Sequence, residues 1–314
     1  MKFLKDEPVW EERYRPQTLS DCILKKNVET EFKSIVEKGH IGRLLLHGSP
    51  GTSKTTTAIA LCRTMGLDWD FVNASSERGI DMIRDRIVGF AATASLSGNG
   101  KCFIIDEACR LTPTAQDALK AEVERFAKSC SFVMTANHPN RLTDAIKSRF
   151  TYIDFDPSKD DQTQMQSKVM TRMQKILDNE CIPYDPKVLA QLVVKHFPDN
   201  RAILRLLQYY SSHGNIDEGI LMMVDQVAVS ALVSAIKEKK FKSVVQFAEH
   251  NASNDTSSMY EELYKALITD IQKDSIADMI TIINEYQRYD SVVPSKTLHL
   301  VAMATELMST VDFK

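Results

Sequence analysis

The chain has 314 residues, of which 43% are hydrophobic and 26% are charged, a composition that supports a buried core and excludes collagen-like or low-complexity chains. The net charge of −3 excludes a generic polycation, so any contact with DNA has to come from a local basic patch. No apolar run approaches the roughly 20 residues of a membrane span, and the charged start MKFLKDEPVWEERYRP lacks a signal-peptide core. We therefore expect a cytoplasmic protein with no membrane partner, whose six cysteines are reduced and mostly buried.

The first half alternates short apolar stretches with helical patterns. Almost purely apolar strands that alternate with helices are typical of a parallel sheet covered on both faces. The predicted strands lie at 44–47, 71–73, 102–106, 132–135 and 151–155, and the predicted helices at 55–65, 80–92, 114–127 and 141–146. This part of the chain is therefore expected to form an α/β domain.

Helical patterns dominate the second half. The segment from Pro157 to Asp161 indicates a loop and a helix start. The strongest helix is predicted at 199–211, and His213-Gly214-Asn215 ends it. Further helices are predicted at 227–236, 242–249, 257–269, 275–289 and 295–308. We expect three domains: an α/β domain over 1–156, a small helical domain over 157–224 and an all-helical domain over 225–314.

A phosphate-binding motif follows the first predicted strand, at Gly48-Ser49-Pro50-Gly51-Thr52-Ser53-Lys54-Thr55-Thr56. It has the strand before it and the helix after it that a P-loop requires. Small residues let backbone N–H groups wrap a polyphosphate, and the helix start adds the positive end of its dipole. Lys54 can reach the terminal phosphates, and the Thr55 hydroxyl can bind Mg²⁺. Ser53 replaces the consensus glycine and would be strained if the backbone there is glycine-like.

Two further strand ends carry polar residues. The apolar strand at 102–106 ends in Asp106 and Glu107, which predicts a carboxylate for Mg²⁺ and a second one that polarises the attacking water. The strand at 132–135 leads to Asn137, whose amide could orient that water, although alone it would be a turn former. Ligands of parallel α/β sheets bind beyond the carboxyl ends of the strands, so these groups should converge with the P-loop.

Four signatures beyond the P-loop identify a family. They are Trp10-Glu11-Glu12-Arg13-Tyr14-Arg15-Pro16 with Leu19 and Asp21, Asn73-Ala74-Ser75-Ser76-Glu77-Arg78-Gly79-Ile80-Asp81, Asp106-Glu107-Ala108 with Gln116-Asp117-Ala118-Leu119, and Ser148-Arg149-Phe150. Over roughly residues 8–155 the chain resembles the AAA+ ATPase subunits of sliding-clamp loaders, the replication factor C family. The second half is similar to the large clamp-loader subunit of T-even-type phages, through Phe197–Arg201, Ser211–Gly214 and Thr297–Leu300.

The resemblance implies a fold and an activity. The fold would be a P-loop AAA+ domain, a small helical lid and a helical collar that assembles a ring. The assembly would be a pentamer of several copies of this chain with one distinct, non-ATPase subunit, in the host cytoplasm if the source is viral. With ATP and Mg²⁺ it would open a ring-shaped sliding clamp and recognise a primer–template junction. DNA-stimulated hydrolysis of ATP would then release the closed clamp on DNA.

The resemblance also implies roles for single residues at the nucleotide. The adenine and ribose would be surrounded by Glu12, Arg13, Tyr14, Arg15 and Ile23, and the phosphates held by Gly51, Thr52, Ser53, Lys54, Thr55 and Thr56. Thr55 and Asp106 would serve magnesium and Glu107 the attacking water. Asn137 would be the first sensor and Arg201 the second. Arg149 would be an arginine finger that reaches the γ-phosphate of the neighbouring subunit.

The DNA contacts implied by the resemblance are Arg78, Gly79, Ile80 and Arg84 at a helix start, where backbone N–H groups can grip phosphate. The Arg78 position would also link DNA to Glu107, which is held away from the water until DNA binds. Lys120 would couple adjacent subunits. Ser76 and Ala121 depart from the family pattern, which bears on the strength of this coupling.

Two alternatives of another class stay open at this point. One is a different AAA+ motor, such as a branch-migration helicase, which shares the P-loop, the Asp-Glu pair and the arginine finger. The other is a scaffold that binds nucleotide without turnover. Ser53 leaves this alternative open, whereas the presence of Lys54, Glu107, Asn137 and Arg149 argues against it. A small-molecule kinase is a more distant possibility, because no acceptor site is evident.

Overall fold

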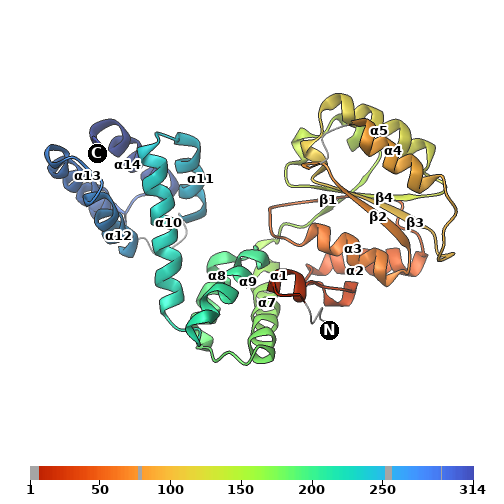
Figure 1. Cartoon of the computed structure of the whole chain (residues 1–314), viewed down its shortest axis with the longest axis horizontal. Coiled ribbons are helices and arrows are strands. Elements are labelled where there is room, and N and C mark those ends of the chain that lie inside the picture. Colours follow the sequence, from red (N-terminus) through yellow and green to blue (C-terminus); the bar gives the residue numbers. More distant parts are fainter. Residues whose placement is uncertain (1–6, 77–79, 252–256, 291) are drawn as a thin grey trace. The chain divides into compact units, whose positions relative to one another are not determined.

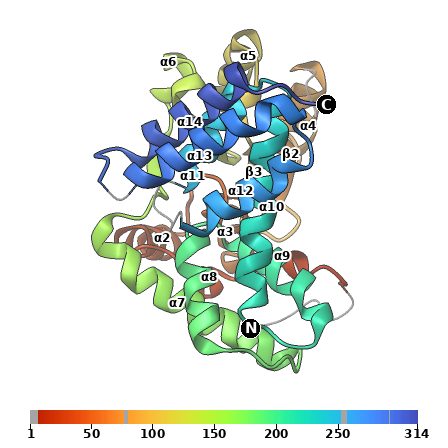
Figure 2. The same cartoon turned by 90° about the vertical axis from the view of Figure 1, so that its left-hand side faces the viewer.

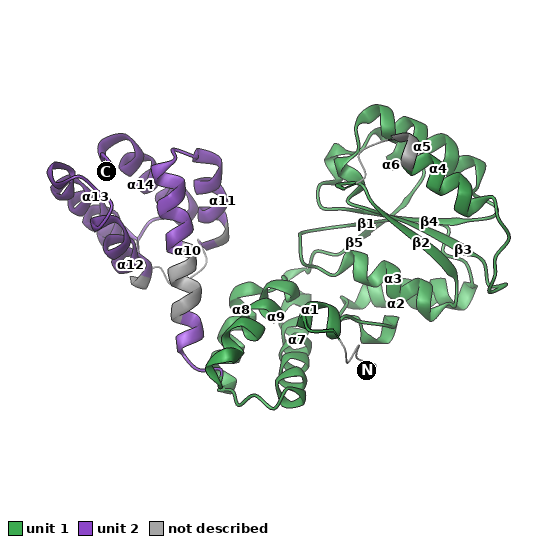
Figure 3. Cartoon of the chain, viewed as in Figure 1, with its two compact units in different colours: residues 1–215 green, residues 216–314 purple. Residues whose placement is uncertain are grey.

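The computed structural model describes residues 7–76, 80–251, 257–290 and 292–314, and the side chains of 80–82, 222–228, 250, 257 and 258 lie outside the description. The chain divides into two compact units, residues 1–215 and 216–314 (Figure 3). Residue 224, the expected second boundary, lies within one continuous helix, α10 (Gly219–Lys237). The division into three domains stays a prediction.

The first unit contains a five-stranded sheet in which every strand pair is parallel. The strand order is β2-β3-β4-β1-β5. The strands are β1 (Arg43–His47), β2 (Asp68–Asn73), β3 (Lys101–Asp106), β4 (Ser131–Ala136) and β5 (Thr151–Asp154). All five predicted strands are confirmed. Strands β3 and β4, the second and third in this order, are buried along their whole length.

Helices cover both faces of this sheet (Figure 1). Because successive strand residues point to opposite faces, Phe103 and Ile105 pack into one core, and Cys102 and Ile104 pack into another. The first core includes residues of α4 and α5, and the second includes residues of α2 and α3. These helices are α2 (Lys26–Lys38), α3 (Lys54–Thr64), α4 (Ile80–Ala91) and α5 (Pro113–Arg125). The predicted α/β domain is confirmed.

Short elements differ from the expectation. The predicted helix at 141–146 is instead a 3₁₀ turn, η3 (Pro139–Arg141), followed by a one-turn helix, α6 (Asp144–Lys147). The reason is the extended backbone of Leu142 and Thr143, with ψ of 142° and 151°, which interrupts the helical path. Further short elements are α1 (Trp10–Arg13), η1 (Leu19–Asp21) and η2 (Ala108–Arg110).

Three helices complete the first unit: α7 (Lys159–Asn179), α8 (Pro186–His196) and α9 (Asn200–Tyr210), which runs into the 3₁₀ turn η4 (Ser211–His213). Each has a capping side chain, because Ser158, Asp185 and Asp199 accept hydrogen bonds from the first backbone N–H groups. The helix predicted at 199–211 is confirmed as α9. Its N-cap residue, Asp199, lies beside Gly51 of the P-loop.

The second unit is helical. It comprises α10, α11 (Phe241–Asn251), α12 (Ser257–Ile268), η5 (Lys273–Ser275), α13 (Ile276–Tyr289) and α14 (Lys296–Thr310). Helices α12, α13 and α14 lie together in Figures 1 and 2 and share one apolar core with α10 and α11. The expected all-helical C-terminal region is confirmed. Across the described part of the chain, no helix combines the length and the apolar character needed to cross a membrane.

Candidate functional site

The polar residues predicted to form the site converge at one edge of the sheet. Strand β4 lies between β3 and β1, and all three are parallel. Their carboxyl ends therefore lie side by side. Strand β3 ends at Asp106 and leads into Glu107, β4 leads into Asn137, and β1 leads into the P-loop. The parallel register brings these segments together although up to 90 residues separate them in sequence. Asn137 is partly buried just beyond β4.

Lys54 opens α3 and folds back into the P-loop. Its Nζ atom donates hydrogen bonds to the carbonyl oxygens of Gly48 (2.8 Å) and Ser49 (2.7 Å), and to Oγ1 of Thr52 (3.2 Å). Burial lowers the pKa of Lys54 from its usual value to about 8, against the opposing charges of Asp156 and Asp106. The ammonium group is therefore held inside the loop by oxygen atoms, the kind of partner that phosphate oxygens can replace.

Ser53 has a left-handed backbone, with φ of 66° and ψ of 23°. Residues with a Cβ atom rarely adopt this conformation, and it costs them of the order of 1–2 kcal/mol. The glycine of the consensus motif would adopt it without that cost. The serine is therefore strained at the position where the sequence departs from the P-loop pattern, and the strain lies directly before Lys54.

Asp106 is the centre of a hydrogen-bond cluster. Its Oδ1 atom accepts hydrogen bonds from the hydroxyl of Thr55 and from Oγ1 of Thr135 (2.7 Å). Its Oδ2 atom accepts a hydrogen bond from Nδ2 of Asn73 (3.3 Å). The side chain is buried, with 9% of its surface exposed. Three donors from α3, β4 and β2 thus fix the orientation of one carboxylate.

This cluster fits a magnesium ion. Mg²⁺ prefers oxygen ligands and takes few of them from a protein, because waters and substrate phosphates complete its shell. The Thr55 hydroxyl and the Asp106 carboxylate touch each other at the P-loop, so they could hold one ion between them. In the described residues no group of three or more His, Cys, Asp or Glu side chains could hold a metal ion.

Glu107 has a strained backbone and a held side chain. Its φ is 53°, which turns the chain sharply away from β3. Its backbone N–H donates a hydrogen bond to Oγ1 of Thr135 (3.0 Å), so this hydroxyl joins both carboxylate residues. Its carboxylate accepts a hydrogen bond from the hydroxyl of Ser75, and its Oε2 atom lies 3.5 Å from Nε of Arg110. In this structure the carboxylate is engaged by the segment after β2.

The lid helix α9 approaches the P-loop through its N-cap. A Cβ atom added to Gly51 would lie 2.4 Å from Cγ of Asp199, so only glycine fits there. Oδ1 of Asp199 accepts the backbone N–H groups of Arg201 and Ala202 at 3.1 Å each. The side chain of Arg201 is exposed, and its positive charge lowers the pKa of Lys54, after the larger effect of burial.

A narrow cavity of about 50 Å³ lies between the N-terminal segment, the start of α3 and the helices α7 and α9. Six of the predicted nucleotide-binding residues from the N-terminal half of the chain contribute to it alongside Arg201. Its lining is Glu11, Glu12, Tyr14, Arg15, Pro16, Ile23, Ser53, Thr56, Arg172, Met173, Asn200, Arg201 and Leu204. Nη1 of Arg15 pairs with Oε2 of Glu12 at 2.9 Å. The cavity therefore opens beside the P-loop, where a nucleoside attached to bound phosphates could lie.

Arg13 is directed to the lid. Its Nη1 atom lies 2.7 Å from Oε1 of Glu180, which follows the end of α7, and its Nε atom donates a hydrogen bond to the carbonyl oxygen of Glu7 (2.6 Å). The hydroxyl of Tyr14 donates a hydrogen bond to the same carboxylate oxygen. Burial, followed by this hydrogen bond, raises the pKa of Tyr14 to about 12.

Arg149 lies after α6, and its hydrogen bonds within the described residues go to α5 and α6 and to the neighbouring Ser148. Its Nε atom donates a hydrogen bond to Oε1 of Glu124 on α5, and its Nη1 atom donates to the carbonyl oxygen of Ala145 (2.6 Å). The pair lowers the pKa of Glu124. Lys120 is partly buried one turn earlier on α5. These contacts hold Arg149 at the surface, at 24% exposure of its side chain.

The predicted DNA contacts are described in part. Arg78 and Gly79 lie outside the described residues, and Ile80 begins α4 with its side chain outside the description. The side chain of Arg84 is 56% exposed, and its Nε atom lies 3.0 Å from Oε1 of the buried Glu122. The buried carboxylate thus holds the Nε atom of Arg84, while more than half of the arginine side chain is open to solvent.

Several residues of the site are missing from the sequence-based prediction. Thr135 and Ser75 hold the two carboxylate residues, Glu124 holds Arg149, and Glu180 and Arg172 hold the N-terminal segment. Thr135 had a signal, because a threonine inside an otherwise apolar strand is a polar group that burial forces to find a partner. The others are common surface residue types whose partners lie far away in sequence.

Family models match three parts of the chain. The model described as "ATPase family associated with various cellular activities (AAA)" matches residues 44–157. The model described as "Sliding-clamp-loader large subunit, AAA+ ATPase lid domain" matches residues 161–222. The model described as "Sliding-clamp-loader large subunit, C-terminal domain" matches residues 255–312.

Curated relatives match over nearly the whole length. The chain is 34% identical to the sliding-clamp-loader large subunit of Enterobacteria phage T4, and 34% identical to that of Escherichia phage RB69; each match covers 98% of both chains. It is 35% identical to the replication factor C small subunit of Haloarcula marismortui over 77% of this chain and 72% of that protein.

Solved structures give the fold. The RuvB Holliday junction branch migration motor of Thermotoga maritima superposes with a TM-score of 0.55 and 16% identity, over 72% of this chain and 80% of that one. At this level of identity the likeness establishes a shared fold over the part of the chain that superposes and carries nothing about activity.

Proposed function

Because this chain belongs to the family of sliding-clamp-loader large subunits and is an AAA+ ATPase, we propose that it uses ATP with Mg²⁺ to drive the loading of a ring-shaped clamp onto primer–template DNA. Its relatives are named for the loading of a sliding clamp. The alternative of a branch-migration motor loses its support, since the match to that motor is a likeness of fold alone.

One observation carries the proposed chemistry: the contact between Thr55 of the P-loop helix and Asp106 at the end of β3. A hydroxyl and a carboxylate placed together beside a phosphate loop are the two protein ligands that a nucleotide-bound Mg²⁺ needs. When bound, Mg²⁺ would neutralise the charge that develops on the phosphates. Lys54 would exchange its backbone partners for phosphate oxygens, since its ammonium already lies inside the loop.

The chain's own residues divide the hydrolytic step among them. Glu107 would polarise the attacking water through its carboxylate, and Asn137, at the end of the neighbouring strand, would orient it. Within the described residues the Arg149 side chain bonds to α5 and α6 of its own chain and not to the P-loop, which suits a residue that acts on the site of an adjacent copy. Arg201 would contact the phosphates from the lid.

DNA would act on this step through the segment after β2. Ser75 holds the Glu107 carboxylate and belongs to the run that leads to Arg78, the proposed DNA contact. Binding of a phosphate backbone by Arg78, Gly79, Ile80 and Arg84 would displace this segment and free the carboxylate. A single copy would bind DNA weakly, and several copies in one assembly would add their contacts.

The proposed assembly is a pentamer in which several copies of this chain join one distinct, non-ATPase subunit. The second unit, 216–314, would form the ring contacts as a helical collar, and Lys120 with Arg149 would couple neighbouring ATPase sites. The proposed place of action is the host cytoplasm. An oligomer is required for activity in this account, because each site borrows an arginine from its neighbour.

The experiment that tests this function is a clamp-loading assay with the chain, its partner subunit, the clamp and primed circular DNA. Glu107→Gln should still bind ATP, the clamp and DNA, but should not release the clamp, because the attacking water is no longer polarised. The wild type should do all of these. A wild-type assembly that binds ATP but never turns it over would instead favour the nucleotide-binding scaffold.

A further inference from the structure

Two side chains at the C-terminal half of α7 hold the N-terminal segment. They are Arg172 and Glu180, which stand eight positions apart, so about two helical turns separate them and they lie on a similar face of the helix. Arg172 lies within α7, and Glu180 is its C-cap. Both contact the segment between Arg13 and Asp21, and both reach Tyr14.

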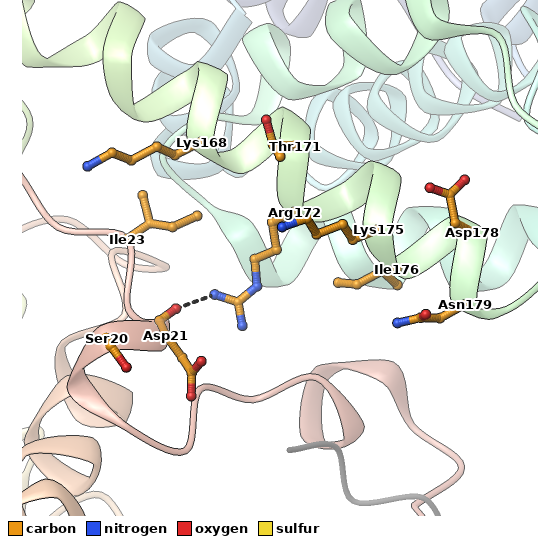
Figure 4. A pocket seen from close by; sticks show the side chains of 10 residues that line it. All are labelled: Ser20, Asp21, Ile23, Lys168, Thr171, Arg172, Lys175, Ile176, Asp178 and Asn179. Carbon is orange, nitrogen blue, oxygen red and sulfur yellow. Dashed lines mark hydrogen bonds between the residues drawn. The ribbon is translucent and has the colours of Figure 1, made fainter. Parts of the chain in front are cut away.

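Arg172 joins two points of the segment at once. Its Nη2 atom donates a hydrogen bond to the carbonyl oxygen of Tyr14 (2.7 Å), and its Nη1 atom donates to that of Asp21 (2.9 Å). Figure 4 shows the guanidinium extended from α7 toward Asp21, with the second of these bonds drawn. One planar group therefore fixes both ends of a stretch of the N-terminal segment that has no strand or long helix to stiffen it.

The hydrogen bond to Asp21 lies beside a cavity. A cavity of about 590 Å³ lies between α7 and the residues around Asp21, and Arg172 is part of its wall (Figure 4). Ser20, Asp21 and Ile23 line it from the segment, and Lys168, Thr171 and Lys175 are among the residues that line it from α7. Arg172 therefore links α7 to the segment at the wall of this cavity. Partial burial lowers the pKa of Arg172, which nevertheless stays charged.

Glu180 supplies a second attachment. It accepts hydrogen bonds from Nη1 of Arg13 (2.7 Å) and from the hydroxyl of Tyr14. The Tyr14 side chain is buried, with 3% of its surface exposed. Tyr14 is thus held by its hydroxyl through Glu180 and by its backbone carbonyl through Arg172.

The held segment forms one wall of the narrow cavity beside the P-loop. Tyr14, Arg15, Pro16 and Ile23 line that cavity, and Ser53 and Thr56 face them from the start of α3. Arg172 itself reaches the same cavity. Lys54 and Asp106 are not part of its lining, whereas Ser53 and Thr56 are, so this space runs from the phosphate loop toward the N-terminal segment, where the nucleoside of a bound nucleotide would lie.

We propose that Arg172 is a positioning residue for the nucleoside of ATP, which acts by holding the Tyr14–Asp21 segment against the lid so that the pocket wall keeps its shape. The proposal rests on the proposed binding of ATP and names a residue of the lid that sets its affinity. Because Arg172 couples α7 to the N-terminal segment, a movement of α7 would also move this wall of the nucleoside pocket.

The test compares Arg172→Met with Lys175→Met in the full-length chain. Lys175 stands nearly one turn further along α7, is exposed, and lines the same large cavity, so it controls for loss of a positive charge there. The probes are ATP and inorganic tripolyphosphate, each with Mg²⁺, titrated by calorimetry. We expect a roughly tenfold weaker affinity for ATP in Arg172→Met, because contacts with the nucleoside are lost. The affinity for tripolyphosphate should stay unchanged, because this probe has no nucleoside.

Steady-state turnover by the assembled loader adds a second readout. KM for ATP should rise in Arg172→Met while kcat stays near the wild-type value, and Arg172→Lys should recover part of the affinity, because an ammonium can reach one of the two carbonyl groups. Glu180→Gln, which keeps the shape of the side chain, should shift ATP affinity in the same direction by less, and it serves if Arg172→Met does not fold.

The outcomes separate the two proposals. A wild-type chain that binds no ATP overturns the proposed function itself. A wild-type chain that binds ATP, with Arg172→Met indistinguishable from Lys175→Met, overturns the role of Arg172. Equal losses of ATP and tripolyphosphate affinity in Arg172→Met also overturn it, because they would mean that the whole site has changed and not its nucleoside end.

Discussion

The carboxylate of Glu107 accepts a hydrogen bond from the hydroxyl of Ser75. Ser75 belongs to the turn after β2, and Glu107 follows β3, the strand that pairs with β2. The bond therefore joins the proposed catalytic glutamate to the segment that leads to the proposed DNA contacts. A hydrogen bond to a charged group is worth about 1.5–3 kcal/mol, which is enough to hold the carboxylate in one of two positions.

Removal of this hydroxyl tests the proposed restraint. Ser75→Ala should raise ATP turnover in the absence of DNA by roughly tenfold, the change in rate that about 1.4 kcal/mol produces, because Glu107 is freed. Turnover with primed DNA should change little, so the ratio of the two rates falls. The measurement is steady-state ATP hydrolysis by the assembled loader with and without primed template.

Ser76 provides the matched control for this variant. Its hydroxyl donates a hydrogen bond to the carbonyl oxygen of Asn73 (3.1 Å), in the same turn. Ser76→Ala should leave turnover without DNA at the wild-type level. If both variants raise it equally, the turn as a whole restrains the site and the Ser75–Glu107 bond has no special role.

Thr135 should matter for both stability and activity. Thr135→Val keeps the shape of the side chain but leaves Asp106 and the Glu107 backbone each without one partner. Loss of such buried partners costs about 1–3 kcal/mol, measurable as a lower free energy of unfolding in urea. Turnover should fall as well, because Asp106 loses its fixed orientation. Thr135→Ser, which keeps the hydroxyl, should retain most of both; equal loss in Thr135→Ser would point to the methyl group instead.

Arg149 and Lys54 should fail in different ways. Arg149→Ala should lower hydrolysis by roughly 10³–10⁵-fold, as loss of an arginine finger does, and leave ATP binding nearly intact. Lys54→Ala should weaken binding itself. The measurements are turnover and ATP affinity for each variant.

A mixture of the two variants tests action between copies. An assembly that contains both can place an intact Arg149 from a Lys54→Ala copy beside the intact P-loop of an Arg149→Ala copy, so part of the activity should return. Equal loss of ATP binding in both variants, or no recovery on mixing, would contradict a role for Arg149 in the site of its neighbour.

The strain at Ser53 should be removable. Ser53→Gly relieves the left-handed backbone but gives the unfolded chain more freedom, so the net gain in the free energy of unfolding should be about 0.5–1 kcal/mol. Ser49→Gly, in the same loop at a residue without positive φ, should lower it. The measurement is the free energy of unfolding of both variants by chemical denaturation. A loss of stability in Ser53→Gly would mean that the serine side chain stabilises the fold by more than its backbone strain costs.

The sequence predicts the sheet and its phosphate site well because both depend on local patterns. Five apolar runs give five strands, and the spacing of Gly51, Lys54 and Thr55 requires no knowledge of distant contacts. The helix α2 is absent from the prediction, since Val28 and Phe32 are its two buried residues and the apolar signal is weak. The one-turn helices α1 and α6 are too short to produce a periodic pattern.

Contacts between distant segments account for the remaining differences. Arg13 belongs to the motif that indicates adenine binding, yet its guanidinium pairs with Glu180, 167 residues away. Arg149 pairs with Glu124 from a different element. Both partners are charged residues of helices, where a solvated surface position is the common outcome. The local sequence shows only that these residues are polar. Their partners, Arg13 and Arg149, follow from the packing of α7 and α5 against other elements.

The most direct test of the central claim is ATP turnover by the wild-type loader without DNA, with blunt duplex and with primed template. We expect slow turnover without DNA, little change with blunt duplex and a clear increase with primed template, because the junction is what releases Glu107 from Ser75. Equal turnover under all three conditions, with ATP bound, would contradict a loader whose hydrolysis is triggered by primer–template DNA.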